Sequence, residues 1–292
     1  MSAASEPVEV IRLWPDGPPT VIENVPPETE YVVSWGLADG TLMIRNISDA
    51  RLNVYAPAPG TANGHGIMVV PGGGWAINAW THEGTDVATA LTALGYTCFV
   101  LKYRLQPTSR DQAKFETTMR KLDSIHAGGV KYADKPTAIG DLISTPQYLA
   151  ARAACADDGR RAIELVRKGA ERFGIRADTL GMIGFSAGAF LTVDVALDPR
   201  ADQVAYIAPI YGGETQGAPV PADAPPLFTA VAQDDILVRI VEGLHADWTA
   251  ADRPSEVHHF RRGAHGFGMV RQGLPSDGWF DLFTTWVRDL GY

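Results

Sequence analysis

Gly184-Phe185-Ser186-Ala187-Gly188 is the stretch of sequence that decides the fold. It is preceded by residues 179–184 (Thr-Leu-Gly-Met-Ile-Gly), a short and largely apolar run that is typical of a buried strand. It is followed by residues 187–196 (Ala-Gly-Ala-Phe-Leu-Thr-Val-Asp-Val-Ala), which predict a helix. A strand that runs directly into a helix through this pentapeptide predicts a sharp turn with Ser186 at its tip.

Gly-x-Ser-x-Gly at a strand-to-helix crossing is the pattern of a nucleophile elbow. The backbone of Ser186 is expected to be strained, which lifts Oγ out of the sheet. Gly184 and Gly188 have no Cβ atoms, so that the strand and the helix can pass close to the turn. The amide of Ala187 would point at the place where a carbonyl oxygen becomes an oxyanion. The alternative is a chance match in a glycine-rich chain, with Ser186 serving only as a helix N-cap.

The composition is that of an ordinary globular protein. The chain has 292 residues, of which 46% are hydrophobic and 20% are charged, enough for one large α/β domain or two small ones. The net charge is −9 and no basic run interrupts it, which argues against a nucleic-acid partner or an anionic membrane surface. No apolar stretch is long enough to span a bilayer. The first residues lack the features of a signal peptide, which fits a cytoplasmic protein or an exported one with its signal removed.

Two kinds of strand follow one another along the chain. Residues 31–35, 41–45 and 51–55 alternate between apolar and polar positions and predict antiparallel strands in an N-terminal extension, residues 1–60. Later strands are continuous apolar runs, as expected of strands covered on both faces: residues 66–70, 96–101, 179–184, 204–210, 227–232 and, less strongly, 256–260. Helical patterns lie between them and at residues 279–290. We therefore predict a single α/β domain, residues 1–292, with a mostly parallel sheet and helices on both faces.

Residues 104–147 do not continue this alternation of strand and helix patterns. They are mixed in charge, contain Pro107, Pro136 and Pro146, and show no strong period. A connection of this length in a compact domain is usually functional, so we expect an inserted cap or lid. Thr145 and Pro146 then predict the N-cap and first residue of a long helix, interrupted near residues 157–159 (Asp-Asp-Gly).

A serine nucleophile needs a base, and the base needs a third group to orient it. On this architecture the expected chain order is Ser, then an acid, then His. Asp234 and Asp235 directly follow the strand at residues 227–232, and His265 lies in a glycine-flanked loop after the last strand. From the residues alone, either aspartate could turn toward the site, and His265 could be an ordinary loop histidine.

Residues 71–75 (Pro-Gly-Gly-Gly-Trp) supply candidates for the rest of an oxyanion hole. Glycines let the backbone turn its amides inward, so Gly73 and Gly74 are the expected partners of the Ala187 amide. Trp75 is the candidate for substrate contact, and the alternative for the whole loop is an ordinary glycine turn. No dinucleotide fingerprint and no Cys/His cluster occurs, so we expect neither a cofactor nor a metal.

Together these motifs resemble the α/β-hydrolase superfamily, and most nearly bacterial esterases of the acetylxylan-esterase and lipase/esterase type. The resemblance rests on the glycine loop, the elbow and the histidine loop, and on these further stretches: residues 13–17 (Leu-Trp-Pro-Asp-Gly), 81–84 (Thr-His-Glu-Gly), 103–105 (Tyr-Arg-Leu) and 235–238 (Asp-Ile-Leu-Val). It runs from about residue 10 to the end, except for residues 104–147. Pro71 departs from it, because many relatives have histidine at this position.

The resemblance implies a serine hydrolase of carboxylic esters that works through an acyl-enzyme. It implies Ser186 as nucleophile, His265 as base and, by the Asp-x-x-Val pattern, Asp235 as the acid, although Asp235 could instead only cap the next helix. It suggests small-molecule esters such as acetylated sugars or small aromatic esters, and the lack of a visible broad apolar lid favours short acyl groups. The alternatives are a peptidase, lactonase or deacetylase with the same triad, or a catalytically silent binding protein.

Overall fold

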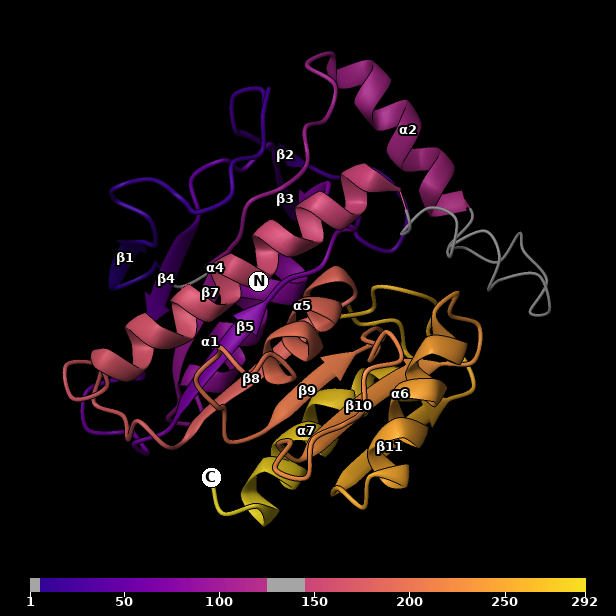
Figure 1. The fold of residues 1–292 in the computed structure, drawn as a ribbon. Coiled ribbons are helices and arrows are strands. Elements are labelled where there is room, and N and C mark those ends of the chain that lie inside the picture. The colour runs from indigo at the N-terminus through magenta and orange to yellow at the C-terminus, as the bar shows by residue number, and fades with distance from the viewer. Residues whose placement is uncertain (1–5, 125–144) are drawn as a thin grey trace.

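The computed structural model describes residues 6–124 and 145–292, and its centre is an eight-stranded sheet (Figure 1). Six neighbouring strands of this sheet run parallel, while β4 and β1 complete one edge in antiparallel pairing. In spatial order the strands are β1 (Glu9–Arg12), β4 (Arg51–Tyr55), β7 (Thr97–Lys102), β5 (Gly66–Val70), β8 (Leu180–Phe185), β9 (Ile207–Ile210), β10 (Leu227–Ala232) and β11 (Ser255–Phe260). The mostly parallel α/β sheet predicted from the sequence is confirmed.

The continuous apolar runs are strands because both of their faces are covered by helices. Every residue of β5, β7, β8 and β10 is buried. Along β5 the side chains alternate between two cores, Met68 and Val70 in one and Ile67 and Val69 in the other.

Each core has its own helices. The first lies beneath α4 (Pro146–Lys168) and α5 (Ala187–Ala196), and the second beneath α1 (Asp86–Thr92) and α7 (Trp279–Asp289). A further helix, α6 (Val238–Ala250), packs against β10 and β11. None of the helices in the two described ranges combines the length and hydropathy needed to cross a membrane.

A second, three-stranded antiparallel sheet lies beside the large one. Its order is β2 (Thr29–Val32), β3 (Leu42–Arg45) and β6 (Ile77–Asn78). Two of the three predicted N-terminal strands are therefore β2 and β3 of this small sheet, whereas residues 51–55 belong to the large sheet. The short strand β1 was not predicted.

No helix was predicted between residues 104 and 144, but part of this segment is helical. Gln112–Ser124 forms the helix α2, which Figure 1 shows lying at the end of the molecule that carries the small sheet. Its helical period is hard to see in the sequence, because only Phe115 and Met119 of residues 112–121 belong to a hydrophobic cluster and most of the other residues in that range are polar. Residues 125–144 of the predicted cap lie outside the described residues.

The predicted interruption of the long helix is also wrong. Thr145 caps α4 and Pro146 is its first residue, as expected, but the helix runs without a break through residues 157–159. Gly159 is needed for close packing, since a Cβ there would lie 2.7 Å from a methyl carbon of Leu191 on α5. Asp158 is fully buried and accepts hydrogen bonds from Arg104. These residues are thus tertiary contacts rather than helix breakers.

Candidate active site

Ser186 sits on the turn between β8 and α5. Its φ of 49° and ψ of −116° lie outside the ordinary helical and extended regions, which is the strained turn that the sequence predicts. A Cβ on Gly184 would lie 2.2 Å from the carbonyl oxygen of Gly188, and a Cβ on Gly188 would lie 2.1 Å from that of Val70. Ser186 makes no side-chain capping bond to α5. Its hydroxyl is therefore available for another partner.

That partner is His265. The Ser186 Oγ lies 2.8 Å from His265 Nε2, and the opposite ring nitrogen, Nδ1, lies 2.9 and 3.0 Å from the two carboxylate oxygens of Asp235. A carboxylate can only accept, so Nδ1 carries the proton and Nε2 is free to accept one from the serine. The sequence-predicted residues Ser186, Asp235 and His265 thus form one continuous hydrogen-bonded chain.

The two neighbouring aspartates have different partners. Asp235 is fully buried, and besides contacting His265 it accepts the Leu237 amide at 2.7 Å, which helps to shape the turn before α6. Asp234 accepts the amides of Gly263 and Ala264 at 3.0 and 2.9 Å. Asp234 thus holds the loop that carries His265, whereas Asp235 contacts the imidazole itself.

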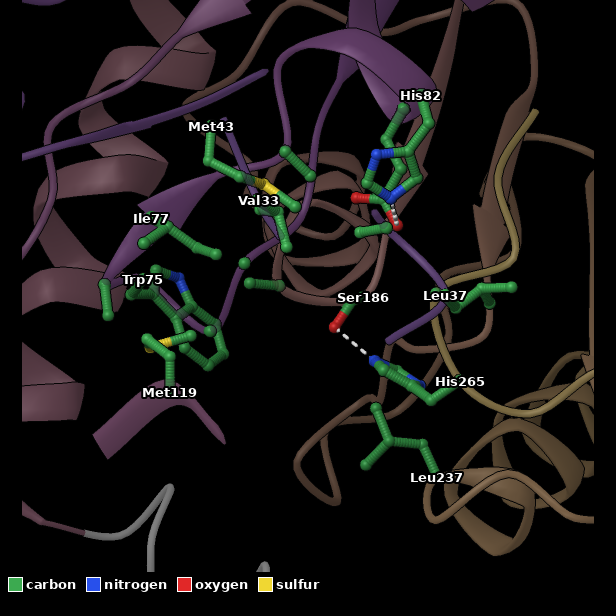
Figure 2. Close-up of a pocket in the computed structure, with 18 of the residues that line it drawn as sticks. Val33, Leu37, Met43, Trp75, Ile77, His82, Met119, Ser186, Leu237 and His265 are labelled. Carbon is green, nitrogen blue, oxygen red and sulfur yellow. Dashed lines mark hydrogen bonds and ion pairs between the residues drawn. The ribbon is translucent and has the colours of Figure 1, made fainter. Parts of the chain in front are cut away.

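The glycine loop faces the serine across the same cavity. Gly73 and Gly74 have φ values of 124° and 59°, which a side chain would disfavour, and a Cβ on Gly73 would lie 2.3 Å from the Ile77 carbonyl oxygen. Neither amide has a hydrogen-bond acceptor among the described residues. Gly73, Gly74, Trp75 and Ala187 all line the cavity into which Ser186 and His265 project (Figure 2).

Known proteins share this architecture. No family model matches the sequence. A solved structure of an acetyl ester-xyloside bifunctional hydrolase from Caldicellulosiruptor lactoaceticus is similar over 99% of both chains, with a TM-score of 0.64 at 20% identity. MGS-M1, an α/β-hydrolase enzyme from a Medee basin deep-sea metagenome library, has a TM-score of 0.58 at 17% identity over 90% of this chain and 97% of its own. This chain has the α/β-hydrolase fold.

A curated relative is also similar in sequence. It is an acetylxylan esterase of Xylanibacter ruminicola, 23% identical over 282 residues, which cover 84% of this chain and 48% of that protein. The chain thus spans about half the length of the curated relative that it matches.

Opposing effects act on the imidazole of His265. Burial alone would lower the pKa of His265, because it disfavours the charged ring. The Asp235 carboxylate, through its charge and its hydrogen bond, and the negative charge of Glu83 favour the charged ring and outweigh burial. The pKa of His265 is therefore raised above its ordinary value of 6.5.

Glu83 and Tyr211 are residues of this site that sequence reasoning missed. Glu83 lies in a π-helical turn, Thr81–Thr85, that precedes α1. One of its carboxylate oxygens accepts the Gly72 amide at 2.7 Å, and the other accepts the Tyr211 hydroxyl at 2.6 Å. The Tyr211 ring lies edge-on to the His265 ring with centroids 5.2 Å apart, and its hydroxyl accepts the Gly268 amide at 3.1 Å.

Glu83 therefore connects the glycine loop with the histidine loop through Tyr211, and it also lines the cavity. Burial, followed by the nearby Glu83 charge, raises the pKa of Tyr211 well above its ordinary range, so the phenol keeps the proton that it donates. Residues 81–84 stood out in the sequence only as a mark of resemblance, and nothing there indicated that Glu83 would be buried. No pattern in the sequence marked Tyr211 as a residue of the site.

The cavity at this site has a volume of about 210 Å³ and a mostly apolar lining. Six of the seven sequence-predicted site residues line it, and the seventh, Asp235, lies behind His265. Within residues 6–124 and 145–292, no group of three or more His, Cys, Asp or Glu side chains is placed to hold a metal ion.

Proposed function

We propose that this protein hydrolyses carboxylic esters of short acyl groups through an acyl-enzyme. The observation that carries the proposal is the hydrogen-bonded chain from Asp235 through His265 to Ser186, with the serine held on a strained elbow beside unpaired loop amides. A buried carboxylate, an imidazole and a serine hydroxyl in this order are the parts that general-base activation of a serine requires.

The reaction would proceed in two steps, acylation of Ser186 and hydrolysis of the acyl-enzyme. Ser186 Oγ attacks the ester carbon while His265 Nε2 takes the hydroxyl proton, and the amides of Ala187 and of Gly73 or Gly74 stabilise the oxyanion. The C–O bond to the alcohol then breaks, and His265 returns the proton to the leaving oxygen. In the second half a water gives its proton to His265 and attacks the acyl-enzyme, which releases the acid and restores Ser186.

Two comparisons support an ester substrate with a small acyl group. The curated relative is named an acetylxylan esterase, and one solved structure is named an acetyl ester-xyloside hydrolase. From these names we propose for this protein only the type of bond that is cleaved, a carboxylic ester of a small molecule. The curated relative is about twice as long as the matched region, so its full substrate is not carried over. We also propose that the small sheet and α2 act as the cap expected over the site of a single domain.

The test is covalent labelling with a fluorophosphonate probe, followed by hydrolysis of p-nitrophenyl acetate and of peptide anilides. We expect labelling and ester turnover without comparable anilide turnover, and Ser186→Ala should lose both, with a fall in kcat on the order of 10⁶. Ser255→Ala is a matched control, because Ser255 Oγ also contacts a histidine, His245, at 2.6 Å but lies on no elbow. Labelling that persists in Ser186→Ala would contradict the serine mechanism, and faster cleavage of anilides would favour a peptidase.

A further inference from the structure

The cavity extends to one side of Ser186 as a chamber with an apolar wall. Figure 2 shows Trp75, Ile77, Met43, Val33 and Met119 on the side of the serine away from His265. We call the space between these five side chains and Ser186 the apolar chamber.

The apolar chamber is built by the small sheet and α2 rather than by the large sheet. Val33 follows β2, Met43 lies on β3, Ile77 lies on β6, and Met119 lies on α2. These elements share a hydrophobic cluster of their own, centred on Phe115.

Phe115 fixes α2 against the small sheet. Its ring is 3% exposed and lies edge-on to Tyr31 with centroids 5.2 Å apart. The Arg45 guanidinium lies 4.6 Å from the same ring and donates a hydrogen bond to Gln112 at 2.9 Å. The helix that carries Met119 is therefore held against the small sheet through Phe115 and Gln112.

The cavity as a whole is larger than an acetyl group needs. The whole cavity has about 210 Å³, whereas an engineered apolar cavity of about 150 Å³ accommodates benzene. A single methyl would leave most of the apolar wall without contacts. An acyl group of roughly four to six carbons would cover it.

The chemistry of the chamber selects against hydroxyl groups. Four of its five side chains are aliphatic or thioether groups, and the one polar nitrogen or oxygen atom among the five side chains is the indole nitrogen of Trp75, which is buried without a hydrogen-bond partner among the described residues. A hydroxyl placed against Met43, Ile77 or Met119 would lose its water without gaining a partner, which costs roughly tenfold or more in affinity.

The position of His265 decides which part of an ester enters. His265 Nε2 must return the proton to the leaving oxygen, so the alcohol has to lie on the histidine side of Ser186. The acyl substituent then points to the opposite side, where the apolar chamber lies.

We propose that the apolar chamber is an acyl-binding site that selects unbranched apolar acyl groups of roughly four to six carbons, with Met119 and Met43 setting its depth. This inference rests on the proposed serine mechanism and narrows its substrate class. Acetyl esters are turned over more slowly, because acetyl leaves the chamber largely empty, and sugar or other polar alcohols remain on the histidine side.

The test is a series of p-nitrophenyl esters from acetate to decanoate, which changes the acyl group and keeps the leaving group constant. We expect kcat/KM to rise about fourfold for each added CH2 until the chamber is filled, and to fall for longer chains. Met119→Trp should lower the hexanoate-to-acetate ratio of kcat/KM at least about tenfold by filling the chamber. Met43→Ala, on a different element, should move the maximum toward longer acyl groups.

Thr118→Ala is the matched control, because Thr118 neighbours Met119 on α2 but is exposed and lies outside the cavity. It should leave the acyl profile unchanged. A profile that peaks at acetate, or a Met119→Trp variant that slows all esters equally, overturns the acyl site while labelling of Ser186 still supports the esterase. If the unaltered protein shows neither labelling nor acetate turnover, the proposed serine mechanism is overturned as well. The failure of the acyl site and the failure of the mechanism are therefore distinguishable.

Discussion

The imidazole of His265 can act as a base only when it is neutral, and its pKa is raised by Asp235 and Glu83. We therefore expect kcat/KM to fall as the pH drops through a value above 6.5. Glu83→Gln keeps the shape of the side chain but removes its charge, so the acid limb of the profile should move to lower pH. The measurement is kcat/KM for p-nitrophenyl butanoate between pH 5 and 9.

Glu214→Gln is the control for this change. Glu214 also pairs with a cation, Arg152, but lies outside the cavity. An acid limb that stays in place in Glu83→Gln would show that Glu83 has only a structural role.

The adjacent aspartates Asp234 and Asp235 allow a paired experiment. Asp235→Asn should lower kcat by about 10⁴, as loss of the orienting carboxylate does in a serine protease. Asp234→Asn should have a much smaller effect, because an asparagine oxygen can still accept the amides of Gly263 and Ala264. Melting temperatures of both variants would separate lost chemistry from lost stability. A larger fall in kcat for Asp234→Asn would reverse the assignment.

At the residue scale, the candidate site could be predicted from the sequence where a local pattern marks its residues. Ser186 could be predicted because the sharp turn at the elbow requires glycines on both sides of the serine. His265 could be predicted because it lies between glycines in the loop that follows the last strand. Glu83 and Tyr211 could not, since their importance comes from a contact between residues 128 positions apart. No local pattern records such a contact.

At the level of elements, the elbow depends on how closely β5 and α5 approach each other. Gly188→Ala would place a Cβ 2.1 Å from the Val70 oxygen, a backbone atom that cannot move aside. We expect a loss of at least about 2 kcal/mol in the free energy of unfolding and a large loss of activity. Urea denaturation with an esterase assay measures both.

Gly243→Ala is the opposite case and serves as the control. Gly243 lies inside α6 with no atom within 4 Å of a Cβ, so the substitution should stabilise the protein by about 1 kcal/mol. If Gly188→Ala proved as stable as Gly243→Ala, the close approach of β5 and α5 would be refuted.

Elements were predictable in proportion to the strength of their pattern. β5 and β10 begin and end where their apolar runs do, because full burial of both faces leaves an unbroken signal. The helix α2 and the small sheet bury only a few side chains each, so their patterns are weak. The apolar wall of the cavity comes from these elements, which is why the sequence showed no broad apolar lid.

At the scale of the whole molecule, Asp158 joins three distant parts of the chain. It lies on α4 and accepts hydrogen bonds from Trp14 Nε1 at 2.7 Å and from the Arg104 side chain and amide at 2.9 Å. Asp158→Ala would leave the Arg104 guanidinium buried without its carboxylate, which we expect to cost about 3–5 kcal/mol. The measurement is the free energy of unfolding in urea.

Asp157→Ala is the neighbouring control, because Asp157 pairs with Arg160 in a more accessible position. It should cost less than about 1 kcal/mol. Equal effects of the two substitutions would show that the buried pair of Asp158 and Arg104 contributes no more to stability than an accessible ion pair.

The order in which the site residues occur along the chain has a consequence for biosynthesis. The glycine loop, the serine and the acid all precede β11, and His265 follows it at the sheet edge. A nascent chain emerges from the ribosome N-terminus first, so it presents Ser186 for some time without its base. Under the proposed mechanism Ser186 gains its base only when β11 has paired with β10, so we expect the growing polypeptide to stay inert toward esters until nearly all of the large sheet has formed.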